Sequence, residues 1–162
     1  NGMDTGFGAL SARHSHAAPA FLTGTAMYLF AIMKTLANYY VPRLNIEMDG
    51  KPRFEQSSTM LAVSIGQCYG NAFWLTPDAR VDDGEFDVLI ADGMGRAAIM
   101  GLVPKLMNKT HVGSPLLKFY KSKRLVIESP DPLVVELDGE IPFFDAHHLE
   151  IEILPKRLQV IA

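Results

Sequence analysis

Leu-Asn-Ile-Glu-Met-Asp-Gly, at residues 44–50, indicates the fold class because it holds a strand and the turn that ends it. Leu44, Ile46 and Met48 alternate with polar residues, which is typical of a strand with one buried face. The Asp-Gly pair is a strong signal for a two-residue hairpin turn. We therefore expect an antiparallel hairpin, with the returning strand near residues 53–56.

Further elements follow on both sides of this hairpin. Residues 60–65 are apolar on both faces, which predicts an internal strand. Helices are expected at residues 19–40, ended by Pro42, and at 96–107, with a kink at Pro104. More strands are expected at residues 86–91, 124–128, 133–137, 149–154 and 158–161.

Seven or more strands and two helices that do not alternate with them indicate a mainly β protein with appended helices, in the α+β class. The expected architecture is an antiparallel β-sandwich. Residues 1–12 are rich in glycine and are interpreted as a strand or loop with close backbone packing. The irregular stretch at residues 66–84 is long for a compact domain, and such loops are usually functional.

Composition restricts the partners. The chain has 162 residues, which fits one domain, with 48% hydrophobic residues and a net charge of -3. Its only basic cluster, at residues 118–124, is too small to predict a nucleic-acid partner. That cluster is either a patch for anionic phosphates or a membrane surface, or a solvated loop before a strand, and the loop is favoured.

Cysteine usage and hydropathy bear on localisation. Cys68 is the one cysteine, so an internal disulfide is ruled out, which fits a reducing cytoplasm. We expect no signal peptide, since no basic flank precedes an apolar stretch at the N-terminus. Residues 17–33 carry no charge but include Pro19 and Gly24, which favours a buried or interfacial helix over a spanning one.

Two acidic stretches are candidates for chemistry. Residues 76–84 hold three carboxylates, from Asp78, Asp82 and Asp83, which could bind a hard cation such as Mg²⁺. Spacing alone favours the alternative that Asp83 and the glycine after it form a turn. In Asp-Gly-Glu at residues 138–140, Glu140 begins the next strand, where it could accept a proton from a substrate hydroxyl or simply face solvent. The five histidines have no zinc-type spacing and are interpreted as surface residues: His14, His16, His111, His147 and His148.

Four stretches in this order resemble the C-terminal domain of the diacylglycerol kinase catalytic family, which includes bacterial lipid kinases and the sphingosine and ceramide kinases. Residues 1–9 look like the family's Asn-x-x-x-x-Gly-Phe-x-Ala opening, and residues 75–84 like its Pro-x-Ala-x-x-x-Asp-Gly segment. Residues 138–140 match its Asp-Gly-Glu, and residues 148–155 resemble its closing strand. One departure is that Gly70 is followed by Asn-Ala where the family usually has further glycines, which leaves the loop shape open.

The resemblance implies a fold, and it implies that two domains bind ATP and lipid separately. It implies the β-sandwich of the NAD kinase/diacylglycerol kinase-like fold, with residues 1–162 as a single lipid-substrate domain. The family's N-terminal ATP-binding domain, with its Gly-Gly-Asp-Gly-Thr motif, is absent from this chain. ATP and lipid would meet in the cleft between the two domains.

The resemblance also implies site residues. Glu140 matches the residue that accepts the proton of the lipid hydroxyl, and Asp78 is a weaker candidate for a catalytic acid. Asp138, Gly139 and Glu140 together would form the cofactor-binding turn.

A structural Mg²⁺ is a further implication of the resemblance. Its side-chain ligand would be Asp83. The backbone carbonyls of Arg80 and Glu85 would complete the protein ligands.

The expected function is therefore part of an ATP-dependent, Mg²⁺-requiring kinase that phosphorylates a lipid hydroxyl, with the fragment inactive alone. Expected partners are the lipid, the chain's own ATP-binding domain and, peripherally, the inner face of the membrane from the cytoplasm. A homodimer stays open because the face meant for the partner domain could self-associate. Two alternatives remain: a lipid-binding or regulatory module without catalysis, and a kinase for a soluble, NAD-like substrate.

Overall fold

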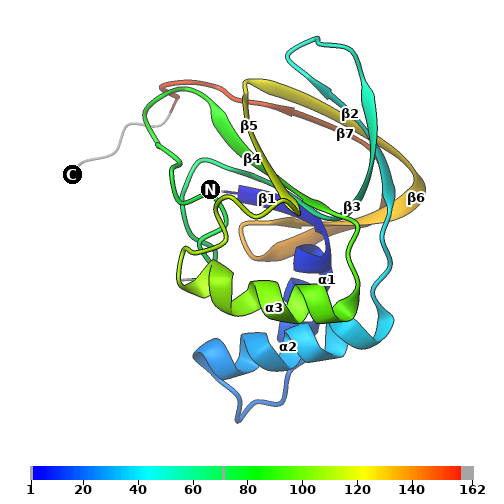
Figure 1. Ribbon diagram of the computed structural model, residues 1–162, viewed down its shortest axis with the longest axis vertical. Coiled ribbons are helices and arrows are strands. Elements are labelled where there is room, and N and C mark those ends of the chain that lie inside the picture. The colour runs from blue at the N-terminus through cyan, green and yellow to red at the C-terminus, as the bar shows by residue number, and fades with distance from the viewer. Residues whose placement is uncertain (1, 71, 158–162) are drawn as a thin grey trace.

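The computed structural model describes residues 2–70 and 72–157. Within them an antiparallel sheet of seven strands lies on one side and three helices gather against it (Figure 1). The elements in chain order are β1 (Gly2–Gly6), α1 (Phe7–His16), α2 (Gly24–Asn38), β2 (Arg43–Met48), β3 (Phe54–Ser64), β4 (Phe86–Asp92), α3 (Arg96–Met107), β5 (Leu117–Ser122), β6 (Arg124–Leu137) and β7 (Glu140–Glu152). The predicted mainly β class and antiparallel architecture are confirmed.

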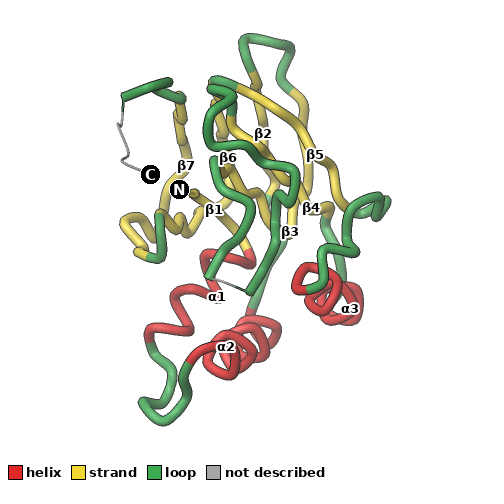
Figure 2. Tube along the Cα trace, turned by 90° about the vertical axis from the view of Figure 1, so that its left-hand side faces the viewer, coloured by secondary structure: helices red, strands yellow, loops and turns green. Residues whose placement is uncertain are grey.

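Two long strands give the sheet a barrel-like closure (Figure 2). β3 pairs with β2 through residues 54–57 and with β1 through 60–64. β6 likewise pairs with β2 through residues 125–128 and with β1 through 135–137. The order β1-β6-β2-β3 therefore returns to β1, while β4 and β5 extend the sheet from β3 and β7 runs along β6.

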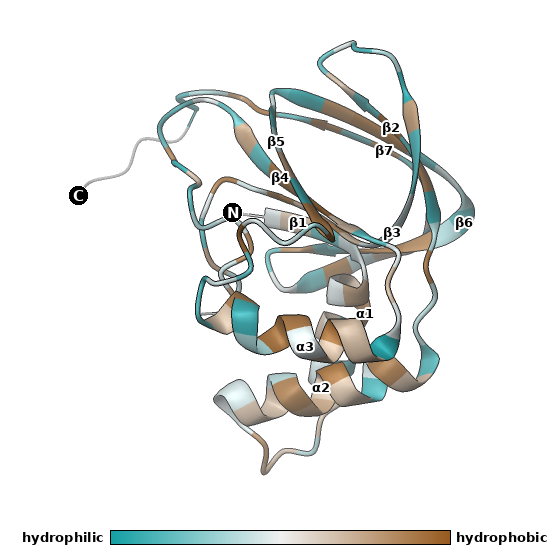
Figure 3. Cartoon of the chain, viewed as in Figure 1, coloured by the Kyte–Doolittle hydropathy of each residue, from teal (hydrophilic) through white to brown (hydrophobic). Residues whose placement is uncertain are grey.

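The pleat of β3 and β4 divides the core into two. Leu61 and Ile90 pack inside the curved sheet, whereas their neighbours Ala62 and Leu89 face the helices. Successive side chains on a strand point to opposite faces, so strands buried on both faces become continuously apolar. This confirms the internal strand expected at residues 60–65, and the apolar bands follow these strands in Figure 3.

The predicted hairpin at residues 44–56 is confirmed. Asp49 and Gly50 both have positive φ, at 52° and 69°, as a two-residue hairpin turn requires. The strand expected near 53–56 is not separate from that at 60–65, because the backbone passes through a register shift between Ser58 and Met60 and continues as β3. The strands expected at 124–128 and 133–137 are likewise one strand, β6.

β6 continues through two prolines, Pro130 and Pro132. Proline has no N–H group to donate to a neighbouring strand, and it is tolerated where the pairing of a sheet is irregular. Here the prolines lie where the β6–β7 register shifts between Glu128 and Leu133. β7 begins at Glu140, nine residues before the strand expected at 149–154, and the strand expected at 158–161 lies outside the described residues.

The helix prediction was incomplete. Residues 7–12 are the start of α1 and not the strand or loop that was expected, because Gly6 has a φ of 89° and breaks the strand there. Helix α2 begins at Gly24, five residues after the predicted start, since Pro19 lies in a separate turn closed by Leu22 N–H to the Pro19 carbonyl. Helix α3 has the predicted bounds, with Pro104 inside it. In the part of the chain described, none of the helices has the length and apolarity needed to cross a bilayer.

The basic stretch at residues 118–124 is mostly strand β5 and not the favoured loop. Its cations are paired: Lys118 lies 3.0 Å from Asp92, and Lys121 lies 2.5 Å from Asp83. Arg124 lies 2.6 Å from Glu150. These pairs reduce the free positive charge available to a phosphate or a membrane surface.

One histidine was assigned wrongly. His111 is fully buried and not a surface residue. Its Nε2 lies 3.3 Å from the carbonyl oxygen of Leu75, and its ring packs 6.0 Å from that of Phe119. A buried histidine with a carbonyl partner ties the 66–84 loop to the segment after α3.

Candidate functional site

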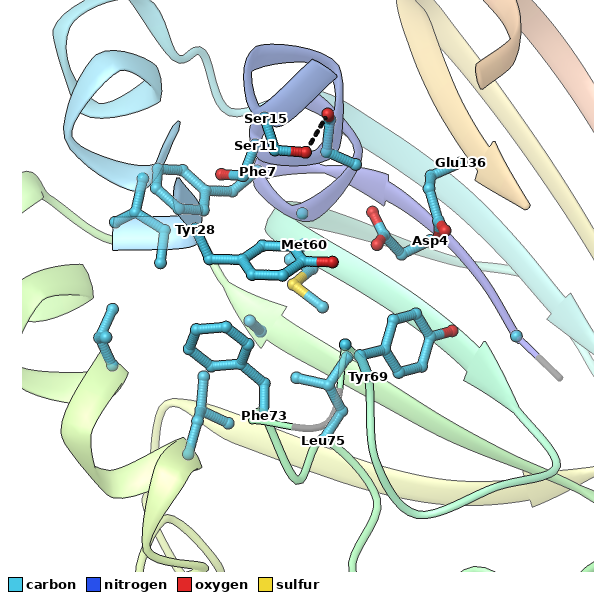
Figure 4. A pocket seen from close by; sticks show the side chains of 18 of the residues that line it. Asp4, Phe7, Ser11, Ser15, Tyr28, Met60, Tyr69, Phe73, Leu75 and Glu136 are labelled. Carbon is cyan, nitrogen blue, oxygen red and sulfur yellow. Dashed lines mark hydrogen bonds between the residues drawn. The ribbon is translucent and has the colours of Figure 1, made fainter. Parts of the chain in front are cut away.

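A pocket of about 480 Å³ lies between the helices and the helix-facing side of the sheet (Figure 4). Its walls come from all three helices, from β1 and β3, and from the 66–84 loop. Most of its lining is hydrophobic. The apolar and aromatic lining residues are Phe7, Ala12, Tyr28, Ile32, Met60, Tyr69, Phe73, Leu75, Ala91, Met94, Ile99, Leu102, Val103 and Leu106.

The 66–84 loop forms one wall, so the prediction that it contributes to a site is consistent with its position. Tyr69 donates its hydroxyl to the Met3 carbonyl at 3.2 Å, which pins the loop to β1. The Phe73 ring packs edge-on against Tyr28 of α2, with ring centroids 6.1 Å apart. Trp74 N–H donates to the Leu106 carbonyl at 3.0 Å, which fixes the loop to α3.

The opposite wall carries two buried carboxyls. Asp4 and Glu136 are direct cross-strand partners on β1 and β6, and they are 3% and 4% exposed. Figure 4 shows the two carboxyls side by side at the pocket wall. Burial raises the pKa of Asp4 well above its usual value, and the neighbouring Glu136 charge raises it further. Burial also raises the pKa of Glu136.

Asp4 Oδ1 and Glu136 Oε2 have no hydrogen-bond partner other than each other's carboxyl. Two ionised carboxylates cannot share a dry site without strong repulsion, so one of the pair stays protonated. The protonated group then donates to the other. The chemistry of this wall is therefore that of a carboxylic acid–carboxylate pair.

The Asp138–Gly139 turn continues this wall. Both residues have positive φ, at 49° and 95°, as in a tight hairpin turn. Gly2 N–H donates to Asp138 Oδ1 at 2.9 Å, and Gly139 N–H donates to Glu136 Oε1. The turn is thus fixed to both β1 and β6. The Gly2 N–H is one of the donors that lower the pKa of Asp138.

The predicted site residues separate into two places. Asp138 and Gly139 line the pocket, whereas Glu140 is exposed and is not part of the lining. Asp78 is exposed and lines a second hollow together with Asp87 and Lys121. Its position leaves it outside the main pocket.

The residues expected to hold Mg²⁺ lie beside that second hollow. Asp83 accepts the N–H of Glu85 at 3.1 Å and the Lys121 ammonium at 2.5 Å, and these hydrogen bonds lower its pKa. Arg80 lies 3.4 Å from Asp82 and does not contact Asp83 in an ion pair. Across residues 2–70 and 72–157, no group of three or more His, Cys, Asp or Glu side chains is placed to hold a metal ion. The residues fit a Mg²⁺ ion only if the Lys121 ammonium leaves Asp83.

Sequence reasoning missed Asp4 and Glu136. A signal was present, because Asp4 is the one acid of β1 and Glu136 lies between the apolar residues Val135 and Leu137. A second signal was Gly8, at which an added β-carbon would lie 2.6 Å from Asp4 Oδ1. Close backbone packing was predicted for this segment, and at Gly8 the structure shows that the carboxyl of Asp4 requires it.

The family of this fold follows from comparison with known proteins. Residues 2–162 match the model of the YegS C-terminal NAD kinase beta sandwich-like domain. The chain belongs to this family. A diacylglycerol kinase from Bacillus subtilis is 24% identical over 119 residues, covering 74% of this chain and 39% of that protein. A diacylglycerol kinase from Mycobacterium tuberculosis is 24% identical over 138 residues, or 85% of this chain and 44% of that protein.

Two further comparisons extend this result. Sphingosine kinase 1 from Arabidopsis thaliana is 33% identical over 72 residues, or 40% of this chain and 15% of that protein. The crystal structure of a diacylglycerol kinase from Bacillus anthracis superposes with a TM-score of 0.61 at 16% identity, over 96% of this chain and 46% of that one. This YegS-type domain therefore spans less than half the length of these relatives, and the relatives are kinases named for lipid substrates.

Proposed function

We propose that this domain is the lipid-binding part of a protein that transfers phosphate from ATP to a lipid hydroxyl, with a diacylglycerol-like lipid as substrate. The observation that carries the proposal is the pocket, which is apolar over most of its lining and has the Asp138–Gly139 turn at its rim. An apolar cavity with a few polar groups at one place suits an acyl chain with a polar head. Membership of the family and the names of the relatives support the reaction type.

The roles of individual groups follow from the chemistry. Phosphoryl transfer to a hydroxyl needs a group that orients the hydroxyl and takes its proton. Glu140 is the proposed base, next to the turn formed by Asp138 and Gly139, and Asp78 is the weaker candidate. ATP would be bound mainly by a separate N-terminal domain of the full-length protein. Mg²⁺ at Asp83, with the carbonyls of Arg80 and Glu85, would order the loop between β3 and β4.

The proposed setting is peripheral to a membrane on its cytoplasmic side. Phe21 is 82% exposed just before α2, and Met33 on α2 is 57% exposed. Exposed apolar side chains next to a lipid pocket favour contact with a bilayer surface, or with a second copy of the chain.

The decisive experiment is ATP-dependent phosphate transfer by the full-length protein across a panel of lipid alcohols, beside Glu140→Gln. We expect labelling of a lipid by the wild type and loss of labelling in the variant without loss of folding. Residues 1–162 alone should be inactive. Labelling of a soluble acceptor that lipid vesicles fail to compete with would instead support a kinase for a soluble, NAD-like substrate.

A second candidate is a lipid-binding or regulatory module without catalysis. The observation that favours it is the position of Glu140, which is exposed and outside the pocket lining. Under this reading the full-length protein binds lipid and labels none. Full activity of Glu140→Gln would reject Glu140 as the base.

A further inference from the structure

The buried pair of Asp4 and Glu136 has no role in the proposed transfer, yet it is costly to keep. Each carboxyl is almost entirely removed from water, and among residues 2–70 and 72–157 no lysine, arginine or histidine side chain forms an ion pair with either. An unpaired buried charge is strongly destabilising, so such a pair persists where it does something specific. One shared proton satisfies both otherwise orphaned oxygens, Asp4 Oδ1 and Glu136 Oε2.

The pair contacts two segments around the pocket. Glu136 Oε1 accepts the N–H of Gly139 in the turn. Asp4 packs against the backbone of Gly8, where a β-carbon would lie 2.6 Å from Asp4 Oδ1, so it also abuts the first turn of α1. Gly2, at the start of the same strand as Asp4, donates to Asp138. Movement of either carboxyl is therefore transmitted to the turn at residues 138–139.

The charged groups around Asp4 and Glu136 determine what loss of the shared proton would do. Among the described residues, the titratable groups that face the pair are Asp138 on the β6–β7 turn and Tyr69 on the 66–84 loop, and burial together with the charges of Asp4 and Glu136 raises the pKa of Tyr69. His16 on α1 lines the same pocket. Loss of the shared proton would put a second negative charge within the pair, and the two adjacent carboxylates would then repel each other.

Building on the proposed function, we propose that Asp4 and Glu136 are positioning residues that hold the Asp138–Gly139–Glu140 turn at the pocket rim through one shared proton. While the proton is present, Glu136 keeps Gly139 in place and the turn presents Glu140 next to the rim. When the proton is lost, the carboxylates separate, the Glu136 contact to Gly139 is disturbed and the turn shifts. The pair itself takes no part in the transfer of the phosphate.

The test uses the full-length protein and two variants of Glu136. In Glu136→Gln the amide nitrogen can donate to Asp4 Oδ1 while the amide oxygen still accepts from Gly139, so the protonated arrangement is kept at every pH. In Glu136→Ala both contacts are lost. We measure the ¹³C carboxyl shifts of Asp4 and Glu136, the amide resonance of Gly139, and kcat and KM for lipid, each across pH.

In the wild type we expect the two carboxyls to titrate as a pair, one of them well above the ordinary range, with the Gly139 amide moving at the same midpoint. The value of kcat should fall roughly tenfold over that titration, an effect of about 1.4 kcal/mol on the barrier. Glu136→Gln should lose this alkaline limb and the Gly139 titration. Its kcat should also exceed that of Glu136→Ala. If the role of the pair were purely structural, the pH profile of kcat would not differ between the wild type and Glu136→Gln.

Two outcomes separate this inference from the proposed function. If both carboxyls are ionised together at neutral pH, or if the amide resonance of Gly139 does not change as they titrate, the positioning inference is overturned even when lipid is phosphorylated. If no lipid is phosphorylated but the shared proton and the Gly139 response are seen, the pair still positions the turn and the kinase proposal fails.

Discussion

Asp4 on β1 and Glu136 on β6 lie directly opposite each other, and their carboxyls meet at the wall of the pocket. This one relationship joins the first strand of the described chain to β6, because residues 3–5 and 135–137 form adjacent strands. It also gives the domain a stability that depends on pH in an unusual direction.

Stability should fall as pH rises above the ordinary carboxyl range. Burial raises the pKa of Asp4 and of Glu136 in the folded state, so between the unfolded and folded values the folded protein holds more protons than the unfolded one. The unfolding free energy therefore decreases with pH in that window, by up to about 1.4 kcal/mol per pH unit for each proton. Below the unfolded pKa values both carboxyls are protonated in the folded and the unfolded state, so this pH-dependent loss of stability is absent.

Urea unfolding from pH 4 to pH 9 measures this slope, an interval of roughly five units around the reference carboxyl values. Asp4→Asn can still donate to Glu136 and should flatten the slope and stabilise the protein at alkaline pH. Asp82→Asn, at an exposed carboxyl, is the matched control and should leave the slope unchanged. Equal slopes for wild type and Asp4→Asn would contradict the shared proton.

Narrowing the pocket should weaken lipid binding without unfolding the domain. Leu102 on α3 lines the pocket, and tryptophan there would fill part of its volume. We expect Leu102→Trp to weaken binding of a fluorescent lipid alcohol by roughly tenfold, or about 1.4 kcal/mol. Met100→Trp lies on the same helix at an exposed position outside the lining and should bind as the wild type does. Equal loss in both variants would show that the pocket is not the lipid site.

The pocket should prefer an uncharged lipid head to an anionic one. Its described lining includes the carboxyls of Asp4, Glu136 and Asp138 and no lysine or arginine. An anionic lipid would meet negative charge there, an effect that salt screens only in part. Diacylglycerol should therefore bind roughly tenfold more tightly than phosphatidylglycerol, a difference of about 1.4 kcal/mol.

Asp138→Asn should reduce this preference, because Asp138 is the most exposed of the three carboxyls and its asparagine replacement has no charge, while the amide oxygen can still accept the Gly2 N–H. Binding of both lipids to vesicles of matched composition gives the comparison. A protein that binds both lipids equally well at low salt would rule out charge selection by this wall.

Removal of Lys121 should reveal the strength of the proposed Mg²⁺ site. Its ammonium contacts both Asp83 and Asp87, and it occupies the place of a cation. We expect Lys121→Met to bind Mg²⁺ roughly tenfold more tightly than the wild type, since two carboxylates then lack a counter-charge. Titration calorimetry measures this gain, and adding Asp83→Asn should abolish it. An unchanged affinity in Lys121→Met would argue against Asp83 as a ligand.

Local patterns predicted the elements whose signals are short-range. The turn at Asp49 and Gly50 and the bounds of α3 agree with the structure, because hairpin turns and helix periodicity are decided by neighbouring residues. The strands that contain a register shift were harder to predict from the sequence. Residues 124–137 were divided at the prolines, and only their pairing with β7 shows that one strand passes through them.

By itself, the sequence determined the mainly β antiparallel class, the long loop at residues 66–84 and the family, since alternation, turn residues and ordered motifs are properties of the chain. The tertiary structure alone decided what meets at the pocket. Asp4 and Glu136 are 132 residues apart in number, and no local pattern marks them as partners. The closure of β1 onto β6 removes both from water at one place, and burial together with mutual repulsion then turns two ordinary acids into a pair that shares a proton.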